Sequence, residues 1–170
     1  MQNKFWLIFS VSFCLILAGC SSSPSKRYSM EQDIAPDVSP SLEHIEDATP
    51  VYESYSLGGN SDYKLRGKSY TIIKSPQGFK QKGIASWYGK KFHGHLTSNG
   101  EIYDMYSMSA AHKELPIPSY VKVTNEDNGK TAIVRVNDRG PFHEGRIIDL
   151  SYDAATKLGV VKTGTAKVHI

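Results

Sequence analysis

The residues best suited to chemistry are carboxylic acids that stand beside turns in the second half of the chain. Asp138 ends a valine-rich run and is followed by a cation and then by Gly140-Pro141, which forces a turn. A carboxyl group at a strand end beside a fixed charge is well placed to have a shifted pKa. Glu101 and Asp104 are two more acids, and Gly100 before them favours a loop over a helix. Such acids suit the cleavage of a glycosidic bond, because the leaving oxygen needs a proton as the bond breaks.

Each of these acids also has a structural interpretation, as a turn cap or a solvated side chain. Histidines offer a second kind of chemistry: His93 and His95, with His112 or His143, carry the nitrogen ligands of a zinc site. Their spacing does not match a known zinc helix, and His112 also suits a hydrogen-bonded position in the core. We therefore expect no metal and no other cofactor.

Two neighbouring aromatic residues precede Gly89. In a strand, Trp87 and Tyr88 point to opposite faces, so that one can pack in the core while the other is exposed. An exposed aromatic ring beside acids suits stacking on a sugar, whereas ordinary core packing is the alternative for Trp87.

Short strands must position these side chains. Asn128 and Gly129 form the strongest hairpin signal, and a helix is expected between an N-cap at Ser151 and a stop at Gly159. Tyr152 and Leu158 would face the core from this helix. Six or so strands around one helix predict a small closed barrel. The expected strands cover residues 68–74, 84–88, 120–124, 131–136, 146–150 and 165–170.

Composition excludes several classes of protein. The chain has 170 residues, of which 39% are hydrophobic and 22% charged, enough for one domain with a segment left over. Its two cysteines, Cys14 and Cys20, both precede the expected domain, so a disulfide scaffold is excluded. The net charge of +3 gives no reason to expect nucleic acid as a partner.

The first residues read as a targeting signal. Lys4 precedes an apolar run of the length found in a signal peptide, although a single membrane anchor helix is the alternative. Residues 17–20 (LAGC) resemble the lipobox of bacterial lipoproteins. This resemblance implies a signal peptide over residues 1–19, removed by cleavage before Cys20, and lipid chains on Cys20. Several acyl chains give a stable anchor, since each buried methylene contributes ~0.8 kcal/mol. Ser21 at the next position resembles the residue that sorts lipoproteins by default to the outer membrane. We therefore expect an outer-membrane lipoprotein that faces the periplasm.

The residues after Cys20 fall into an acidic segment and a basic segment. Residues 21–62 are polar, contain four prolines and have two basic side chains against eight acids, whereas residues 63–170 have seventeen against nine. We therefore expect a lipidated, disordered linker over residues 20–62, with a root-mean-square reach of ~35 Å, and a basic folded domain over residues 63–170.

The motifs of the folded part together resemble the rare lipoprotein A family, and the lipobox is an independent match to it. They occur in the family's order across residues 67–170. The motifs are residues 83–89 (GIASWYG), 92–94 (FHG), 97–105 (TSNGEIYDM), 110–113 (AAHK), 115–121 (LPIPSYV), 136–142 (VNDRGPF) and 145–151 (GRIIDLS).

The resemblance implies a six-stranded double-psi β-barrel with one or two short helices. It also implies a lytic transglycosylase that cleaves the bond between N-acetylmuramic acid and N-acetylglucosamine in peptidoglycan, where the muramyl 6-hydroxyl closes a 1,6-anhydro ring and no water is added. Asp138 then matches the catalytic acid, which protonates the leaving oxygen and accepts the 6-hydroxyl proton. Glu101, Asp104 and His112 would stabilise the positive charge, set the pKa of Asp138 and orient the sugar. We expect substrate contacts from Trp87, Tyr88, Asn99, Asn137 and Arg139.

Two further expectations concern partners. Many members of the family carry a C-terminal SPOR domain that binds peptide-free glycan at the division septum. We expect no SPOR domain in residues 63–170, which the barrel occupies. Peptidoglycan strands, the outer membrane and cell-division proteins are the partners that the resemblance implies, for a protein we expect to be a monomer. The alternative function is a non-catalytic module that binds or loosens the wall, as expansins are thought to do on the same barrel, or a structural lipoprotein that links membrane and wall.

Overall fold

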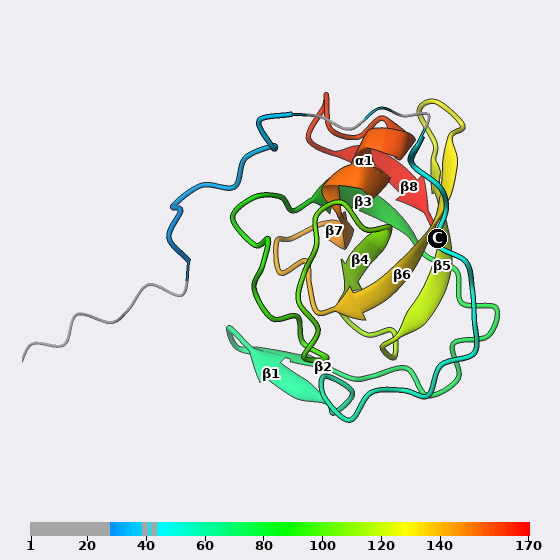
Figure 1. Cartoon of the computed structure of the whole chain (residues 1–170). Helices are drawn as coiled ribbons and strands as arrows, with labels where there is room; N and C mark the ends of the chain where they lie inside the picture. Colours follow the sequence, from blue (N-terminus) through cyan, green and yellow to red (C-terminus); the bar gives the residue numbers. More distant parts are fainter. Residues whose placement is uncertain (1–27, 39–40, 42–43) are drawn as a thin grey trace, which may run out of the picture.

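The structure is a computed structural model that describes residues 28–38, 41 and 44–170. Within these residues, eight strands and one α-helix follow one another (Figure 1). They are β1 (Tyr63–Leu65), β2 (Lys68–Tyr70), β3 (Lys82–Trp87), β4 (Ser109–His112), β5 (Ser119–Asn125), β6 (Thr131–Asp138), β7 (Arg146–Leu150), α1 (Tyr152–Leu158) and β8 (Ala166–His169).

Six of the strands close into a barrel in the order β3-β7-β4-β6-β5-β8. The pairs β3/β7 and β4/β6 are parallel, and the other neighbours are antiparallel. This arrangement is the expected double-psi β-barrel, and it confirms the predicted fold class. Its interior is filled by small and branched side chains, among them Val123, Val134, Val136, Ile148 and Leu150, none of which is exposed.

The helix α1 begins and ends at the residues that the sequence predicted. The Ser151 side chain accepts a hydrogen bond from the backbone N–H of Ala154, and Gly159 ends the helix in the left-handed conformation with φ of 75°. Tyr152 and Leu158 are buried against the barrel. The cap, the stop and the buried face were therefore all readable from the sequence.

Two strands differ from the expectation. The run predicted over residues 68–74 forms a strand only at Lys68–Tyr70, where β2 pairs with β1 in a separate hairpin outside the barrel. The sixth barrel strand is instead β4, Ser109–His112, which was not predicted. Alanine and serine have low strand propensity, and β4 forms because β6 and β7 bond it from both sides.

Residues 44–62 form a strap that packs against the barrel, seen in cyan in Figure 1. Ala48 donates a backbone hydrogen bond to Ile133, Ser56 donates one to Ile117, and Ile45 is buried. This part of the expected linker over residues 20–62 is therefore bonded to the domain rather than free of it, and the boundary predicted at Tyr63 is too late. The strap can do this because its polar side chains satisfy backbone groups of the barrel.

The predicted signal peptide, residues 1–19, the lipidation residue Cys20 and the first part of the linker lie outside the described residues. Across the residues that are described, no helix has the length and apolar character needed to cross a membrane.

We predict that Asn60→Ala lowers the free energy of unfolding by about 1–3 kcal/mol, because the Ile117 N–H then loses its partner and the Ile117 carbonyl keeps only the hydrogen bonds from Ser56. The Asn60 amide donates to the Ile117 carbonyl at 2.6 Å, and its Oδ1 accepts from the Ile117 N–H at 2.8 Å. Urea titration of the purified protein measures the change, and the exposed neighbour Ser61→Ala is the control. Equal stability of the two variants would show that the hydrogen bonds of Asn60 do not stabilise the fold.

Candidate active site

A row of four residues crosses the barrel where two carboxyl groups come together. In the register of the strands, Asp149 on β7 faces Ala111 on β4, and Ala111 in turn faces Asp138 on β6. Ser86 on β3 pairs with Asp149 at the other end of the row. With strands ~4.8 Å apart, the Cα atoms of the two aspartates are roughly 10 Å apart, with only a methyl group between them.

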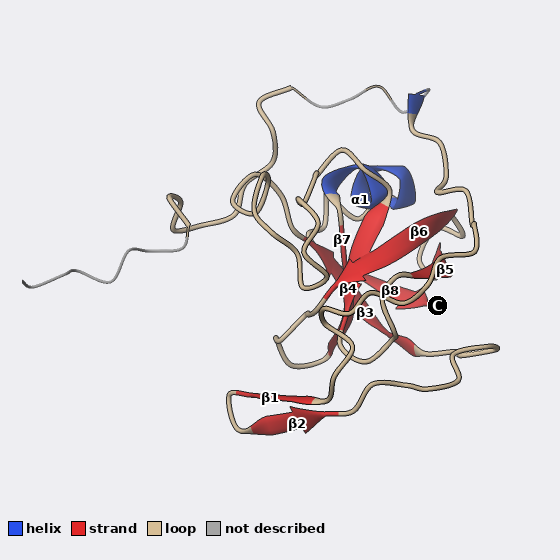
Figure 2. Ribbon diagram, turned by 60° about the horizontal axis from the view of Figure 1, so that its bottom comes forward, coloured by secondary structure: helices blue, strands red, loops and turns tan. Residues whose placement is uncertain are grey.

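These carboxyl groups lie on the floor of a groove with a volume of about 1020 Å³. One wall is the hairpin formed by β1 and β2, which hangs beside the barrel in Figures 1 and 2, and the other is the loop of residues 91–98. Ala111, Asp138 and Asp149 line the groove between these walls. Both acids are therefore reached from the same groove.

Asp138 is held firmly at the end of β6. Its Oδ1 accepts hydrogen bonds from the N–H of Ser98 at 2.8 Å, from the Ser98 hydroxyl at 2.5 Å and from the N–H of Arg139 at 2.7 Å. Among the described residues, these donors all use Oδ1, so Oδ2 is left for a ligand. The turn that the sequence indicated after Asp138 thus fixes the orientation of its carboxyl group.

Asp149 is the functional candidate that the sequence reasoning missed. Burial raises the pKa of Asp149, against the opposing effects of a hydrogen bond from Ser86 and the charge of Arg146. Arg146 also donates to the Ser86 hydroxyl at 3.0 Å. The available signal was an acid inside an otherwise apolar strand, IIDL, since a charged residue is seldom placed there without a specific role.

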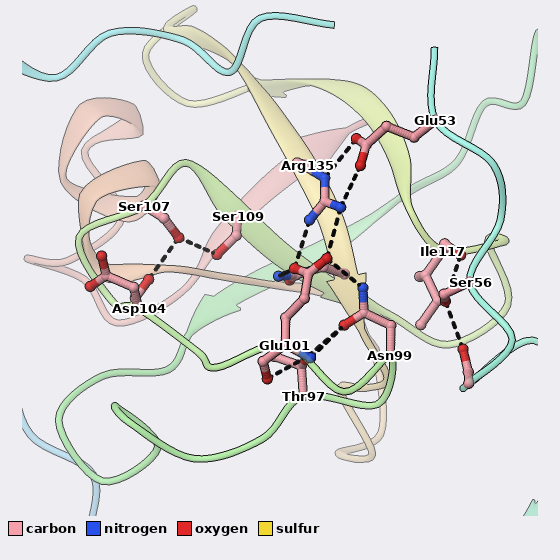
Figure 3. Close-up of polar contacts among 12 residues, drawn as sticks. Glu53, Ser56, Thr97, Asn99, Glu101, Asp104, Ser107, Ser109, Ile117 and Arg135 are labelled. Carbon is pink, nitrogen blue, oxygen red and sulfur yellow. Dashed lines mark hydrogen bonds and ion pairs between the residues drawn. The ribbon is translucent and has the colours of Figure 1, made fainter. Parts of the chain in front are cut away.

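Glu101 is brought close to the groove but is locked in a different network (Figure 3). Arg135 on β6 donates to both oxygens of Glu101 at 2.7 and 2.8 Å, and to both oxygens of Glu53 on the strap at 2.8 and 2.7 Å. The hydrogen bonds from Arg135 are the main reason that the pKa of Glu101 is lowered to about 2. Glu101 therefore remains a carboxylate and is unsuited to giving a proton.

Two predicted substrate contacts, Asn99 and Asn137, hold Glu101 instead. The amide groups of both donate to it at 2.9 Å, as Figure 3 shows for Asn99. Asn137 is buried, whereas Asn99 also accepts a hydrogen bond from Thr97 at 2.6 Å. Since Ser98 lies between Thr97 and Asn99, this network fixes the loop that contacts Asp138.

Asp104 and His112 do not line the groove. Asp104 is exposed and lies 3.5 Å from the Nδ1 atom of His93. His112 is buried on the other face of β4, where its Nδ1 accepts from the N–H groups of Glu114 and Leu115 and its Nε2 lies 3.0 Å from Gln81. Burial lowers the pKa of His112 to about 3, so the ring is neutral.

The remaining predicted contacts line the groove in different ways. Trp87 is half-buried and packs edge-on against Tyr152, whereas Tyr88 is buried with its ring stacked on Tyr103, 4.0 Å between centroids. Of these two rings, Trp87 is thus the one that a sugar can reach. Arg139 directs its guanidinium to carbonyls of the chain, those of Gly59, His112 and Leu115.

A second hollow of about 1140 Å³ lies between the strap, residues 76–82 and β5. It contains none of the predicted catalytic residues. Its two glutamates, Glu53 and Glu126, are both in ion pairs, and the groove above Asp138 and Asp149 is therefore the better candidate. Within the described part of the chain, no three His, Cys, Asp or Glu side chains gather as a metal site would require.

Comparisons with known proteins show the family to which the chain belongs. A family model described as "Lytic transglycolase" matches residues 80–170. The protein named endolytic peptidoglycan transglycosylase RlpA of Vibrio cholerae is 76% identical over 169 residues, which cover 99% of this chain and 63% of that protein. The chain belongs to the rare lipoprotein A (RlpA) family.

Other RlpA proteins extend the comparison. The RlpA of Pseudomonas aeruginosa is 50% identical, and the alignment covers 88% of this chain and 43% of that protein. The RlpA of Rickettsia bellii is 42% identical, and the alignment covers 100% of this chain and 74% of that protein. The chain thus spans less than two thirds of the V. cholerae and P. aeruginosa proteins. Among solved structures, a Streptomyces papain inhibitor has a TM-score of 0.41 at 23% identity, covering 54% of this chain and 93% of that one, a similarity too low to carry an argument.

We predict that Glu101→Gln makes stability less sensitive to acid. The pKa of Glu101 is about 2 in the folded protein against an ordinary value of 4.5, so its contribution is complete above pH 4.5 and is lost as the pH falls towards 2. Urea titrations between pH 5 and pH 2.5 should give a shallower decline for Glu101→Gln than for wild type. The exposed Glu144→Gln is the control, and parallel curves for all three proteins would contradict the network.

Proposed function

We propose that this chain is a lytic transglycosylase that cleaves the bond between N-acetylmuramic acid and N-acetylglucosamine in peptidoglycan. The observation that carries the proposal is the pair of carboxyl groups, Asp138 and Asp149, on either side of Ala111 on the floor of one groove. The printed names of the relatives, endolytic peptidoglycan transglycosylase, support the same reaction.

The reaction needs one proton given and one proton taken. A carboxylic acid protonates the leaving oxygen of N-acetylglucosamine as its bond to the muramyl C1 breaks. The muramyl 6-hydroxyl then bonds to C1, and the carboxylate recovers a proton from that hydroxyl. The products are a free 4-hydroxyl and a 1,6-anhydro ring, so no water is consumed. The nucleophile is already part of the substrate, which lowers the entropic cost of the attack.

The different surroundings of the two acids support different roles, as in other enzymes with paired carboxyl groups. Burial raises the pKa of Asp149, which favours the protonated form that a general acid must have. Asp138, for which the family resemblance implies the proton transfers, keeps a catalytic role in this proposal. Its fixed carboxylate stabilises the positive charge that develops on the sugar ring.

The other predicted residues act here by positioning. Glu101 holds the loop that bonds Asp138, and His112 fixes the turn after β4 by accepting two backbone hydrogen bonds. Asp104 accepts from the N–H of Tyr106 and orders the turn beside His93. Trp87 supplies the ring on which a sugar stacks.

Digestion of purified sacculi by the full-length protein in detergent tests the proposal. Mass spectrometry of the released glycans should find 1,6-anhydro ends. Hydrated reducing ends would instead make the protein a hydrolase, and binding without products would favour the expansin-like alternative.

We predict that Asp138→Asn and Asp149→Asn each reduce product release by at least a hundredfold, since each amide removes a charge or a proton that the reaction needs. Both variants should still bind sacculi and retain the barrel, as measured by sedimentation and circular dichroism. The exposed Asp127→Asn is the control. Wild-type turnover by either groove variant would remove that residue from the mechanism.

We also propose that Cys20 carries lipid and holds the protein on the outer membrane, on the basis of the LAGC motif and the serine that follows it. Cys20→Ala should move the protein out of the outer-membrane fraction, because the acyl chains supply the anchor. Fractionation of cells that express the variant, with Cys14→Ala as the control, measures this. Retention of Cys20→Ala in the outer membrane would contradict the assignment.

A further inference from the structure

The hairpin of β1 and β2 supplies one wall of the groove although it precedes residues 80–170, which match the family model. It stands apart from the barrel, as Figure 2 shows. Tyr63, Leu65 and Arg66 line the groove from this side. The hairpin is therefore placed to contact whatever lies over Asp138 and Asp149.

Its base is held rigidly. The rings of Tyr63 and Tyr70 stack with centroids 4.8 Å apart, and both meet Phe142 edge-on, at 6.2 and 5.8 Å. The Tyr63 hydroxyl donates to the Lys113 carbonyl at 2.9 Å. A hairpin of two three-residue strands is not stable by itself, so these contacts maintain it as a fixed wall.

The tip of the hairpin is a two-residue turn with an unusual residue. Leu65 pairs with Lys68, which leaves Arg66 and Gly67 as the central residues, with φ of 49° and 79°. Turns with two positive φ angles favour Asn-Gly, and an arginine in the left-handed region is strained. Stability therefore does not account for Arg66, and strain of this kind often accompanies a functional role.

The charge of Arg66 has no local partner. Among the described residues, no carboxylate lies within the 4.0 Å of an ion pair with its guanidinium. A guanidinium binds a carboxylate through two parallel hydrogen bonds. Because Arg66 is exposed and lines the groove, its guanidinium is placed to bind a carboxylate of a ligand in this way.

The proposed substrate carries such a group. Every muramyl residue has a 3-O-lactyl substituent, which ends either in a free carboxylate or in a peptide that itself bears carboxylates. We propose that Arg66 binds a carboxylate on the muramyl substituent and so selects muramyl-containing glycan for the groove. This inference depends on the proposed function for the identity of the substrate, and it adds a specificity-determining residue outside the catalytic pair.

Arg66→Asn tests the inference because asparagine is favoured at this turn position and lacks the guanidinium group. The hairpin should thus remain intact, which equal or higher thermal stability confirms. Lys68→Gln is the matched control, since Lys68 is a cation of the same hairpin that does not line the groove. Arg66→Lys keeps the charge and should retain part of the affinity.

Binding of the full-length protein in detergent is measured with three glycans: peptide-bearing strands, peptide-free muramyl strands and chitooligosaccharides, which have no carboxylate. Arg66→Asn should weaken binding of a carboxylate-bearing glycan by about five- to tenfold at low salt, and high salt should reduce the difference. Binding of chitooligosaccharides should not change.

Weaker binding of peptide-free strands identifies the lactyl carboxylate, and weaker binding of peptide-bearing strands alone identifies a peptide carboxylate. Either result supports the inference. Wild-type affinity for all three glycans, or an equal loss on chitooligosaccharides, overturns it. A wild-type protein that binds muramyl glycan but releases no anhydro product refutes the proposed function and leaves the test of Arg66 standing.

Discussion

The register of β4 against its two neighbours is the constraint on which the rest of the site depends. Because Ala111 faces Asp138 on one side and Asp149 on the other, carboxyl groups from β6 and β7, which are not paired with each other, share one floor. A shift of one residue would turn Ala111 inward and place the bulky His112 on that floor. The small side chain between the acids keeps the groove open enough for a polymer.

The barrel alone does not make the groove. Its walls come from two segments that are not barrel strands, the hairpin of β1 and β2 and the loop of residues 91–98. Arg135 bonds both Glu53 on the strap and Glu101, whose carbonyl accepts from the N–H of Thr97 in this loop. The segments outside the barrel thus determine how the acids are presented, while the strands determine where they are.

Local signals in the sequence were reliable and long-range ones were not. Ser151 and Gly159 predicted a helix because caps act within a few residues, whereas β4 depends on bonds to β6 and β7 and has no strand propensity of its own. The strap was expected to be free because it belongs to an acidic linker with four prolines, but its side chains satisfy barrel groups that only the fold brings near. Asp138 was recognisable beside its turn. Asp149 had only the weaker signal of an acid within the apolar run IIDL, and its burial in the fold is what shows that the acid is unusual.

The central claim is that a glycan strand crosses the row formed by Asp138, Ala111 and Asp149. A crystal structure of the inactive Asp149→Asn variant with a muramyl tetrasaccharide tests it most directly. The bridging oxygen of the scissile bond should lie above Ala111, within hydrogen-bonding distance of the side chain at position 149. A tetrasaccharide bound instead in the hollow between the strap and residues 76–82 would contradict the account.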